Sequence, residues 1–131
     1  MMKVGGICAG GLNVGSIYLH HNVGAGGAAN LALLHQVANV LQMVSGPWVI
    51  GGDWNDPPAA LISTGWLDRV EADIVAPSTP TCNGKVYDFC VVSRTFRHAV
   101  LCARRIADAG RTPHSPVRLW VRVSPRSMLV R

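Results

Sequence analysis

Four short polar clusters stand beside apolar stretches of the chain, and their side chains are of kinds that act on phosphate esters. They are Leu19-His20-His21, Gly52-Asp53-Trp54-Asn55, Tyr87-Asp88-Phe89 and Pro113-His114-Ser115-Pro116-Val117. Carboxylates can hold a hard metal ion or activate water, and imidazoles can stabilise developing negative charge. If folding brings His20, Asp53, Asn55, Asp88 and His114 together, the sequence predicts a site for attack on a phosphate.

Each cluster taken alone also has a plainer explanation. A histidine at the end of a strand is usually an ordinary polar residue. Asp followed by Asn after a strand usually makes a turn, because both side chains cap the local backbone. Asp88 within an apolar run needs a partner, but that partner could be an arginine instead of a cation. The order and spacing of the four clusters favour the phosphate site.

The elements that must position these clusters can be read from hydrophobic patterning and turn residues. Strands are expected at 4–9 and 15–19 around a turn at 10–13, then at 48–51, 86–92 and 117–123; a short helix is expected at 59–64. Residues 52–58 form a polar loop after a short buried strand. The segment 97–109 fits either a helix or a strand. Strand 117–123 has one apolar and one basic face.

The clearest helix is expected at 30–45. Apolar residues recur there at steps of three and four, namely Leu31, Leu34, Ala38, Leu41 and Val44. Asn30 is a plausible N-cap, and Gly46 followed by Pro47 should end the helix.

Length and composition predict one domain over residues 1–131, with frayed ends at 1–3 and 124–131. The chain is 49% hydrophobic and 15% charged, which suits a packed core. Its apolar stretches are far shorter than the roughly 20 residues of a membrane span. The start is a poor signal peptide and the four cysteines are expected to be buried free thiols. We therefore expect an intracellular protein, cytoplasmic or nuclear.

Charge is distributed unevenly along the chain. Residues 1–84 hold two basic and five acidic side chains, a net charge of −3, whereas 85–131 hold ten basic and two acidic ones, a net charge of +8. An arginine-rich C-terminal part suits a polyanionic partner such as nucleic acid. Solubility of an edge strand, or base composition of the coding sequence, would explain the arginines equally well.

Taken together, the motifs resemble the endonuclease/exonuclease/phosphatase superfamily, which includes deoxyribonuclease-type and apurinic endonucleases, sphingomyelinases and inositol polyphosphate phosphatases. His20 closes an apolar strand, and 52–55 resembles the family's Gly-Asp-Phe-Asn motif with Trp54 for Phe. Residues 79–82 with 87–93 resemble its Thr-rich loop and Asp-bearing strand. Residues 114–117 resemble its closing Ser-Asp-His-x-Pro-Val motif.

The resemblance implies an α/β fold with mixed, α+β-like sheets, as the C-terminal half of a four-layer α/β sandwich. It implies a hydrolase that cleaves phosphodiesters with Mg²⁺, or Mn²⁺, held by Asp53 and Asp88. The substrate would be nucleic acid or another phosphodiester, such as an inositol phosphate or a lipid.

The resemblance also implies a role for each site residue. Asp53 would orient or deprotonate the attacking water, Asn55 would hold the scissile phosphate, and His20 would contribute to the same pocket. Asp88 would be a second acid near the metal or phosphate. His114 would contact the phosphate in the transition state.

Two departures from the family pattern predict weak or absent cleavage by the chain alone. The acid that precedes the final histidine is Pro113 here, so His114 is expected to lack its orienting carboxylate. The family's metal-binding glutamate comes from its N-terminal half, and the only glutamate of this chain, Glu71, has no motif around it.

Two alternatives to an enzyme remain open. One is a catalytically inactive remnant of the fold that binds nucleic acid through its arginine-rich C-terminal half. The other is a small α/β domain whose motif matches are coincidental. Half of the fold would leave apolar sheet surface uncovered, which favours a missing N-terminal half or self-association. A chain that holds only this half of the fold would be expected from a truncated gene, or as a fragment of a polyprotein such as a retroelement carrying an endonuclease.

Overall fold

The structure is a computed structural model that describes residues 1–8, 10–107, 110 and 112–122. In chain order its elements are β1 (Met2–Val4), β2 (Leu12–Tyr18), α1 (Ala28–Met43), β3 (Trp48–Asp53), α2 (Pro58–Ser63), α3 (Trp66–Arg69), β4 (Ala72–Val75), β5 (Asp88–Ser93), α4 (Arg94–Arg97), β6 (Val100–Arg105) and β7 (Val117–Val121).

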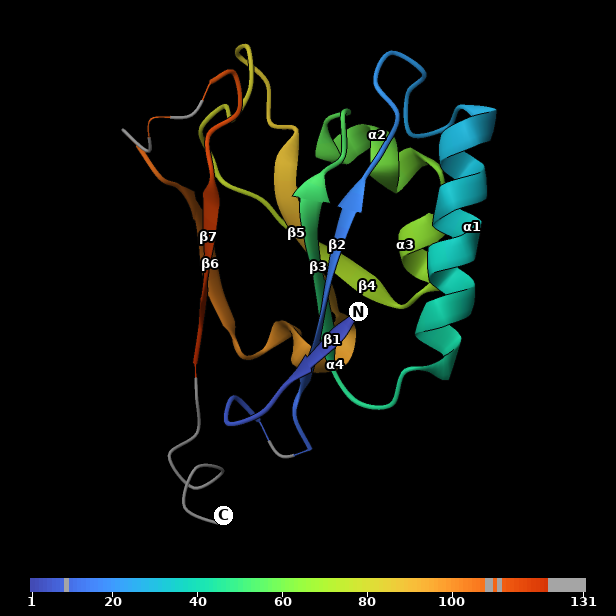
Figure 1. Cartoon of the computed structure of the whole chain (residues 1–131), viewed down its shortest axis with the longest axis vertical. Coiled ribbons are helices and arrows are strands. Elements are labelled where there is room, and N and C mark those ends of the chain that lie inside the picture. Colours follow the sequence, from blue (N-terminus) through green and yellow to red (C-terminus); the bar gives the residue numbers. More distant parts are fainter. Residues whose placement is uncertain (9, 108–109, 111, 123–131) are drawn as a thin grey trace.

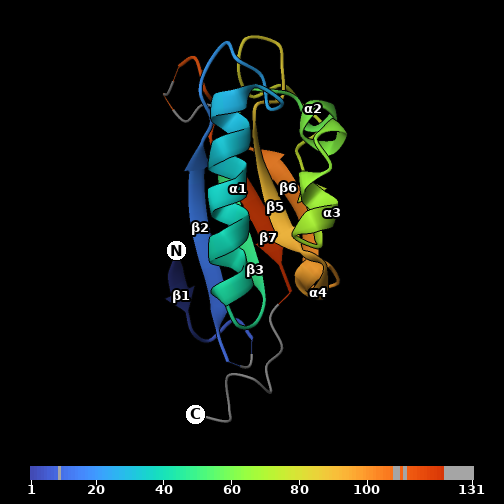
Figure 2. The same cartoon turned by 90° about the vertical axis from the view of Figure 1, so that its right-hand side faces the viewer.

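The strands form two sheets. The larger sheet has the order β1-β2-β3-β5-β4, in which β2 and β3 are parallel and the other neighbours are antiparallel. β6 and β7 form a separate antiparallel pair. Helices α1, α2 and α3 lie on one face of the five-stranded sheet and the β6–β7 pair lies on the other (Figures 1 and 2). The mixed α/β prediction is confirmed, and the described residues form three layers: the helices, the five-stranded sheet and the β6–β7 pair.

The central strand β3 is buried on both faces. Trp48 and Ile50 pack toward the helices, whereas Val49 packs toward the β6–β7 pair. This arrangement explains why the sequence of the strand lacks the alternation of a half-exposed strand. One core lies between the helices and the five-stranded sheet, and a second core lies between this sheet and the β6–β7 pair. Together they fix the direction of β3 and so the position of its last residue, Asp53.

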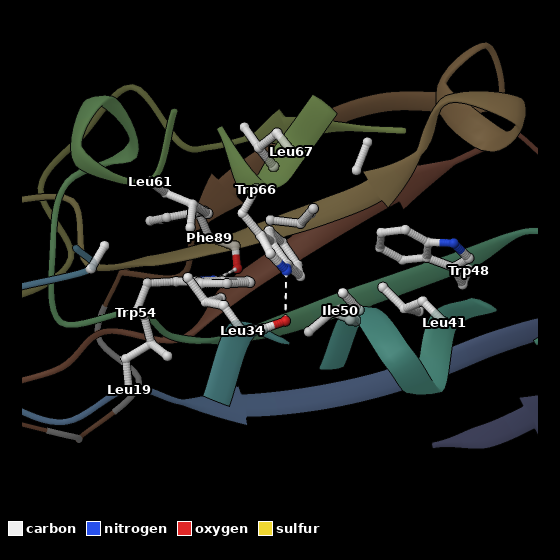
Figure 3. Packing of buried hydrophobic residues seen from close by; sticks show 14 residues of the cluster. Leu19, Leu34, Leu41, Trp48, Ile50, Trp54, Leu61, Trp66, Leu67 and Phe89 are labelled. Atoms are coloured by element: carbon white, nitrogen blue, oxygen red, sulfur yellow. Dashed lines mark hydrogen bonds between the residues drawn. The ribbon is translucent and has the colours of Figure 1, made fainter. Parts of the chain in front are cut away.

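The loop after β3 is anchored by an aromatic cluster beneath the helices. The ring of Trp54 stacks on Phe89 at 5.2 Å between centroids and lies 6.1 Å from the ring of Trp66. Its Nε1–H donates to the Phe89 carbonyl oxygen at 3.0 Å, and Trp66 Nε1–H donates to the Leu34 carbonyl oxygen at 2.7 Å (Figure 3). The aromatic residue of the 52–55 motif is therefore a core residue.

The first two strands differ from the prediction. The expected strand at 4–9 is wrong, since β1 is Met2–Val4 and residues 5–8 lie outside any strand; Ala9 lies outside the described residues. Residues 12 and 13, expected in a turn, begin β2. Asn13 Nδ2–H donates to the carbonyl oxygens of Ser45 and Pro47 at 2.9 and 3.1 Å, so a buried side-chain contact ties this segment into the sheet.

The expected N-cap of the long helix is also wrong. α1 begins at Ala28 with Gly27 as its N-cap, and it ends at Met43 instead of residue 45. Asn30 lies inside the helix, fully buried. Its Oδ1 accepts from the His20 N–H at 2.7 Å, and its Nδ2 donates to the carbonyl oxygens of His20 and Gly24. Asn30 therefore clamps the loop after β2 instead of capping the helix.

The other expected elements occur with small shifts. The short helix and the strands that carry Asp53 and Asp88 are displaced by one or two residues, and the ambiguous segment 97–109 contains strand β6. The short elements α3, β4 and α4 were not expected.

Val117, Leu119 and Val121 face the second core while Arg118 and Trp120 are exposed, as predicted for β7. Residues 123–131 lie outside the described residues. Met2 and Lys3, expected at a frayed end, pair with β2.

All four cysteines are free, as expected, but only Cys82 is buried; Cys8, Cys90 and Cys102 are partly exposed. Among the described residues, none of the helices combines the length and the apolar character that a membrane crossing requires.

Candidate active site

Asp53 and Asp88 meet because their strands are neighbours in the sheet. Asp53 is the last residue of β3 and Asp88 the first of β5, and the two stand directly opposite each other in the antiparallel register. Each side chain is 17% exposed. The pairing places two carboxylates at one edge of the sheet, open on one side to solvent.

His114 reaches the two carboxylates from the connection between β6 and β7. Its backbone forms a bridge with Cys82, and the neighbouring Ser115 N–H donates to the Thr81 carbonyl oxygen at 2.8 Å. His114 Nδ1 lies 2.8 Å from Asp88 Oδ2, and Nε2 lies 3.4 Å from Asp53 Oδ2. The imidazole therefore stands between the two carboxylates, with one nitrogen facing each.

Thr81 organises the loop that holds this arrangement. It is 2% exposed, and its Oγ1 accepts from the backbone N–H groups of Tyr87 at 3.1 Å and Asp88 at 3.0 Å. These bonds fix the point at which β5 begins. The sequence analysis identified the Thr-rich loop only as part of a motif and missed the role of Thr81 in positioning β5. A threonine six or seven residues before a strand is only a weak signal of such a role.

Asn55 joins the loop after β3 to the loop after β2. It adopts a left-handed backbone conformation, with φ of 50°, and its N–H donates to Asp53 Oδ1 at 3.0 Å. Its Nδ2–H donates to the Leu19 carbonyl oxygen at 2.6 Å. Asp53 and Asn55 therefore form a local turn, as the plainer explanation of this motif expected. One N–H of the carboxamide is therefore already bonded to the protein.

His20 lies at the same edge of the sheet but is not joined to the cluster. β2 and β3 are parallel and Tyr18 is paired with Asp53, so the residues after β2 emerge near Asp53. The His20 side chain is exposed, and its imidazole makes no hydrogen bond within the part of the chain that the structure describes. Its role in a phosphate pocket stays a prediction.

The expectation that Pro113 deprives His114 of an orienting carboxylate is wrong, because Asp88 bonds to Nδ1 from a different strand. Glu71, in contrast, does not supply the absent glutamate. It lies just before β4, whose first residue pairs with Ser93 at the far end of β5 from Asp88. Among the described residues, the group whose ligand atoms come close enough to hold a metal ion is Asp53, Asp88 and His114.

The donor atoms suit a divalent cation in kind. Ligand atoms of Asp53, Asp88 and His114 all lie within 4.8 Å of one another. Mg²⁺ is commonly held by one or two carboxylates together with waters and substrate phosphates. Both carboxylates also line a shallow groove of about 230 Å³. A larger groove of about 460 Å³ lies at the opposite edge, around Arg69, Glu71 and Arg94, away from this cluster.

The pKa of His114 provides a test of the arrangement in the metal-free protein. The hydrogen bond to Asp88 raises it above the ordinary 6.5, with a further contribution from the Asp53 charge, against a smaller opposing effect of burial. The pair therefore stabilises the fold fully below pH 6.5, and this stabilisation is lost as pH rises through the folded-state pKa.

We expect a proton NMR titration in the presence of EDTA to place the His114 pKa above the ordinary 6.5, and Asp88→Asn to lower it. Asp73→Asn, a carboxylate of β4 that pairs with Arg94, is the matched control and should leave the titration unchanged. An unchanged His114 pKa in Asp88→Asn would show that the ring is not paired with Asp88 in solution.

No family model matches the sequence, and no curated protein sequence matches it significantly. Solved structures do match. CdtB, the biologically active subunit of cytolethal distending toxin, is 27% identical over 70% of this chain and 42% of its own, with a TM-score of 0.52. The cytolethal distending toxin of Actinobacillus actinomycetemcomitans is 18% identical over 81% of this chain and 48% of its own, with a TM-score of 0.62.

The endonuclease domain of TRAS1, a telomere-specific non-LTR retrotransposon, is 18% identical over 72% of this chain and 52% of its own, with a TM-score of 0.58. Coincidental motif matches would give no reason for the acidic and histidine side chains to meet, whereas Asp53, Asp88 and His114 lie together at one edge of the sheet. The chain therefore has the endonuclease/exonuclease/phosphatase-type nuclease fold, and it spans about half the length of the solved structures that it matches.

Proposed function

We propose that the chain carries the catalytic cluster of a metal-dependent phosphodiesterase that acts on nucleic acid. The observation that carries the proposal is the convergence of Asp53, Asp88 and His114 at one sheet edge, with ligand atoms within 4.8 Å of one another. Carboxylates and an imidazole in this arrangement are groups that can hold a metal ion, activate water and stabilise a phosphate under attack. The similarity to a retrotransposon endonuclease domain supports the choice of nucleic acid.

A Mg²⁺ or Mn²⁺ ion at Asp53 and Asp88 would supply charge neutralisation for the phosphate and a lowered pKa for water. The residues of the chain would orient the water, the imidazole and the phosphate. Asp53 would orient the attacking water, and Asp88 would hold the His114 ring through Nδ1. Nε2 of His114 faces Asp53, and it would contact an incoming phosphate. The second N–H of the Asn55 carboxamide, not engaged by Leu19, would donate to a phosphate oxygen.

A second candidate function is nucleic-acid binding without cleavage. The outer face of the β6–β7 pair carries exposed Arg104 and Arg118 side by side in register, and exposed Trp120. The Arg118 guanidinium carbon lies 5.7 Å from the centre of the Trp120 ring. Arginines bind phosphates, and an exposed aromatic ring stacks on bases, so this face suits a single-stranded segment.

We also propose a partner for the outer sheet, a cellular location and an origin for the chain. Leu101, 55% exposed, is an apolar side chain of the outer sheet that a second half of the fold or a second copy of the chain could cover. Four free thiols support an intracellular location, where thiols stay reduced. The similarity to a retrotransposon domain supports an origin in a retroelement.

The experiment is cleavage of supercoiled plasmid DNA by purified chain, with Mg²⁺, with Mn²⁺ and with EDTA. The proposal expects nicking that requires the metal and is lost in Asp53→Ala. Asp73→Ala is the matched control, because its side chain is 42% exposed beside Arg94 and away from the cluster. Cleavage that survives Asp53→Ala would refute the assigned site.

Absence of cleavage by any of these proteins would favour the binding candidate. In that case filter binding should show affinity that falls with salt. Arg118→Ala should weaken it and reduce the logarithmic salt slope by about 1.

A further inference from the structure

An asparagine followed by a glycine stands in an exposed turn that the proposed hydrolysis does not use. Of the six asparagines of the chain, only Asn83 precedes a glycine. Asn83 and Gly84 lie in the connection between β4 and β5, and both are exposed. This connection extends past the edge of the sheet at which β3 ends and β5 begins (Figure 1). The pair therefore lies in solvent at the same edge as the candidate active site.

The turn around this pair is joined directly to the loop of the histidine. Cys82 and Lys85 are paired by two backbone hydrogen bonds, of 2.9 and 3.0 Å, and Asn83 and Gly84 close the turn with φ of 48° and 76°. Both angles are left-handed, as in the type I′ turns for which Asn-Gly is a preferred pair. The backbone of Cys82 is also bridged to His114, so one residue both begins the turn and holds the histidine loop.

An Asn-Gly pair can change covalently without an enzyme. The backbone nitrogen of Gly84 attacks the carboxamide carbon of Asn83, the proton of the glycine N–H passes to solvent, and the carboxamide nitrogen leaves as ammonia when the succinimide ring closes. Water then opens the ring at either carbonyl carbon. One product is aspartate, and the other is isoaspartate, in which the backbone runs through the former side chain. Water is the only co-reactant, and asparagine is among the chemically labile residues.

Three features favour this reaction at Asn83. Glycine has no side chain to hinder the approach of its nitrogen, whereas the β-branched Val23 crowds the same position after Asn22. Among the described residues, the hydrogen bonds of the turn leave out the N–H of Gly84. Ring closure requires the turn to open locally, and exposed loop tips open at a small cost in free energy.

We propose that Asn83 is a modification site, at which spontaneous conversion to isoaspartate loosens the loop that holds the candidate active site. Isoaspartate adds one methylene group to the backbone inside the turn. The longer backbone no longer fits the two hydrogen bonds between Cys82 and Lys85, and Cys82 transmits the change to its bridge with His114. Thr81 is affected as well, because its N–H donates to the Lys85 carbonyl oxygen at 2.8 Å while its hydroxyl fixes the start of β5. The modified chain should therefore be less stable.

The first test follows the purified chain during incubation at physiological temperature and mildly alkaline pH, which favours loss of the glycine N–H proton. Peptide mapping by mass spectrometry should show Asn83 exchanging NH₂ for OH, and an isoaspartate methyltransferase should label the same peptide. Asn22 is the internal control, because it is exposed with φ of 63° but precedes valine, and it should stay intact over the same period. Intact Asn83 in the folded chain, under conditions that convert a free peptide of residues 79–88, would overturn the modification site.

The second test separates the longer backbone from the new charge. Ion-exchange chromatography isolates the converted chain, of which isoaspartate is the usual major product, and urea unfolding should give it a lower midpoint than the unmodified chain. Asn83→Asp carries the same charge on an ordinary backbone, and its midpoint should stay close to wild type because Asp-Gly also suits this turn. A converted chain as stable as Asn83→Asp would refute the loosening of the loop. Neither test depends on cleavage, so an inactive chain would leave this proposal standing.

Discussion

Trp54→Ala is expected to lower the free energy of unfolding by about 3–5 kcal/mol, the usual cost of removing a large buried aromatic side chain. Trp54 is 1% exposed, stacks on Phe89 and contacts Trp66. The substitution leaves a cavity between α1 and the sheet, and it removes the donor that satisfies the Phe89 carbonyl oxygen (Figure 3). Urea unfolding followed by far-ultraviolet circular dichroism measures the change.

Two variants make the Trp54 result interpretable. Trp120→Ala applies the same change to a side chain that is 48% exposed, and it should cost far less. Trp54→Phe keeps an aromatic ring against Phe89 but loses the hydrogen bond, so an intermediate loss is expected. Equal losses at Trp54 and Trp120 would mean that the aromatic cluster does not anchor the loop that carries Asp53.

Gly52→Ala is the second large effect, and it arises from the distance between two strands. A Cβ at Gly52 would collide with the backbone carbonyl oxygen of Ile17 on the neighbouring strand β2. Neither backbone can move without breaking the parallel ladder, so we expect a loss of about 3 kcal/mol or more. The adjacent Asp53 should be displaced as well, so metal binding should weaken in whatever fraction of the protein remains folded.

Gly51→Ala is the matched control for this prediction. A Cβ at Gly51 would meet only the Cys90 Sγ, at an ordinary 3.7 Å. Because alanine also restricts the unfolded chain, the variant should be neutral or more stable by about 0.5–1 kcal/mol. Chemical denaturation of the two variants in parallel separates a strand-specific collision from a general intolerance of side chains in β3.

The sequence was sufficient to find the residues of the cluster but not its internal geometry. The convergence of Asp53, Asp88 and His114 was implied by the resemblance of the motifs, in their order along the chain, to the endonuclease/exonuclease/phosphatase superfamily. The pairing of Asp88 with the His114 ring did not follow. The family pattern places the orienting acid directly before the histidine, at position 113. The actual partner is Asp88, which lies 26 residues before His114 at the start of β5.

Errors in the elements have similar physical causes. Asn30 and Asn13 were assigned to a cap and a turn by their local preferences, yet both are buried. Asn13 bonds to backbone groups 32 and 34 residues away, and Asn30 bonds to the loop after β2, outside its own helix. Tertiary contacts of this kind override local preference. Cys82 is a buried free thiol, as expected, but nothing in its sequence neighbourhood shows that the backbone bridges it to His114.

The most direct test of the central claim, that Asp53 and Asp88 hold a divalent ion at one edge of the sheet, is paramagnetic broadening by Mn²⁺ in ¹H–¹⁵N NMR spectra of the metal-free chain. Substoichiometric Mn²⁺ should first remove the amide signals of Asp53, Asn55 and Asp88. Signals of Glu71 and Ser93, at the opposite edge, should persist. Broadening that is strongest around Glu71, or that is unchanged in Asp53→Ala, would contradict the account.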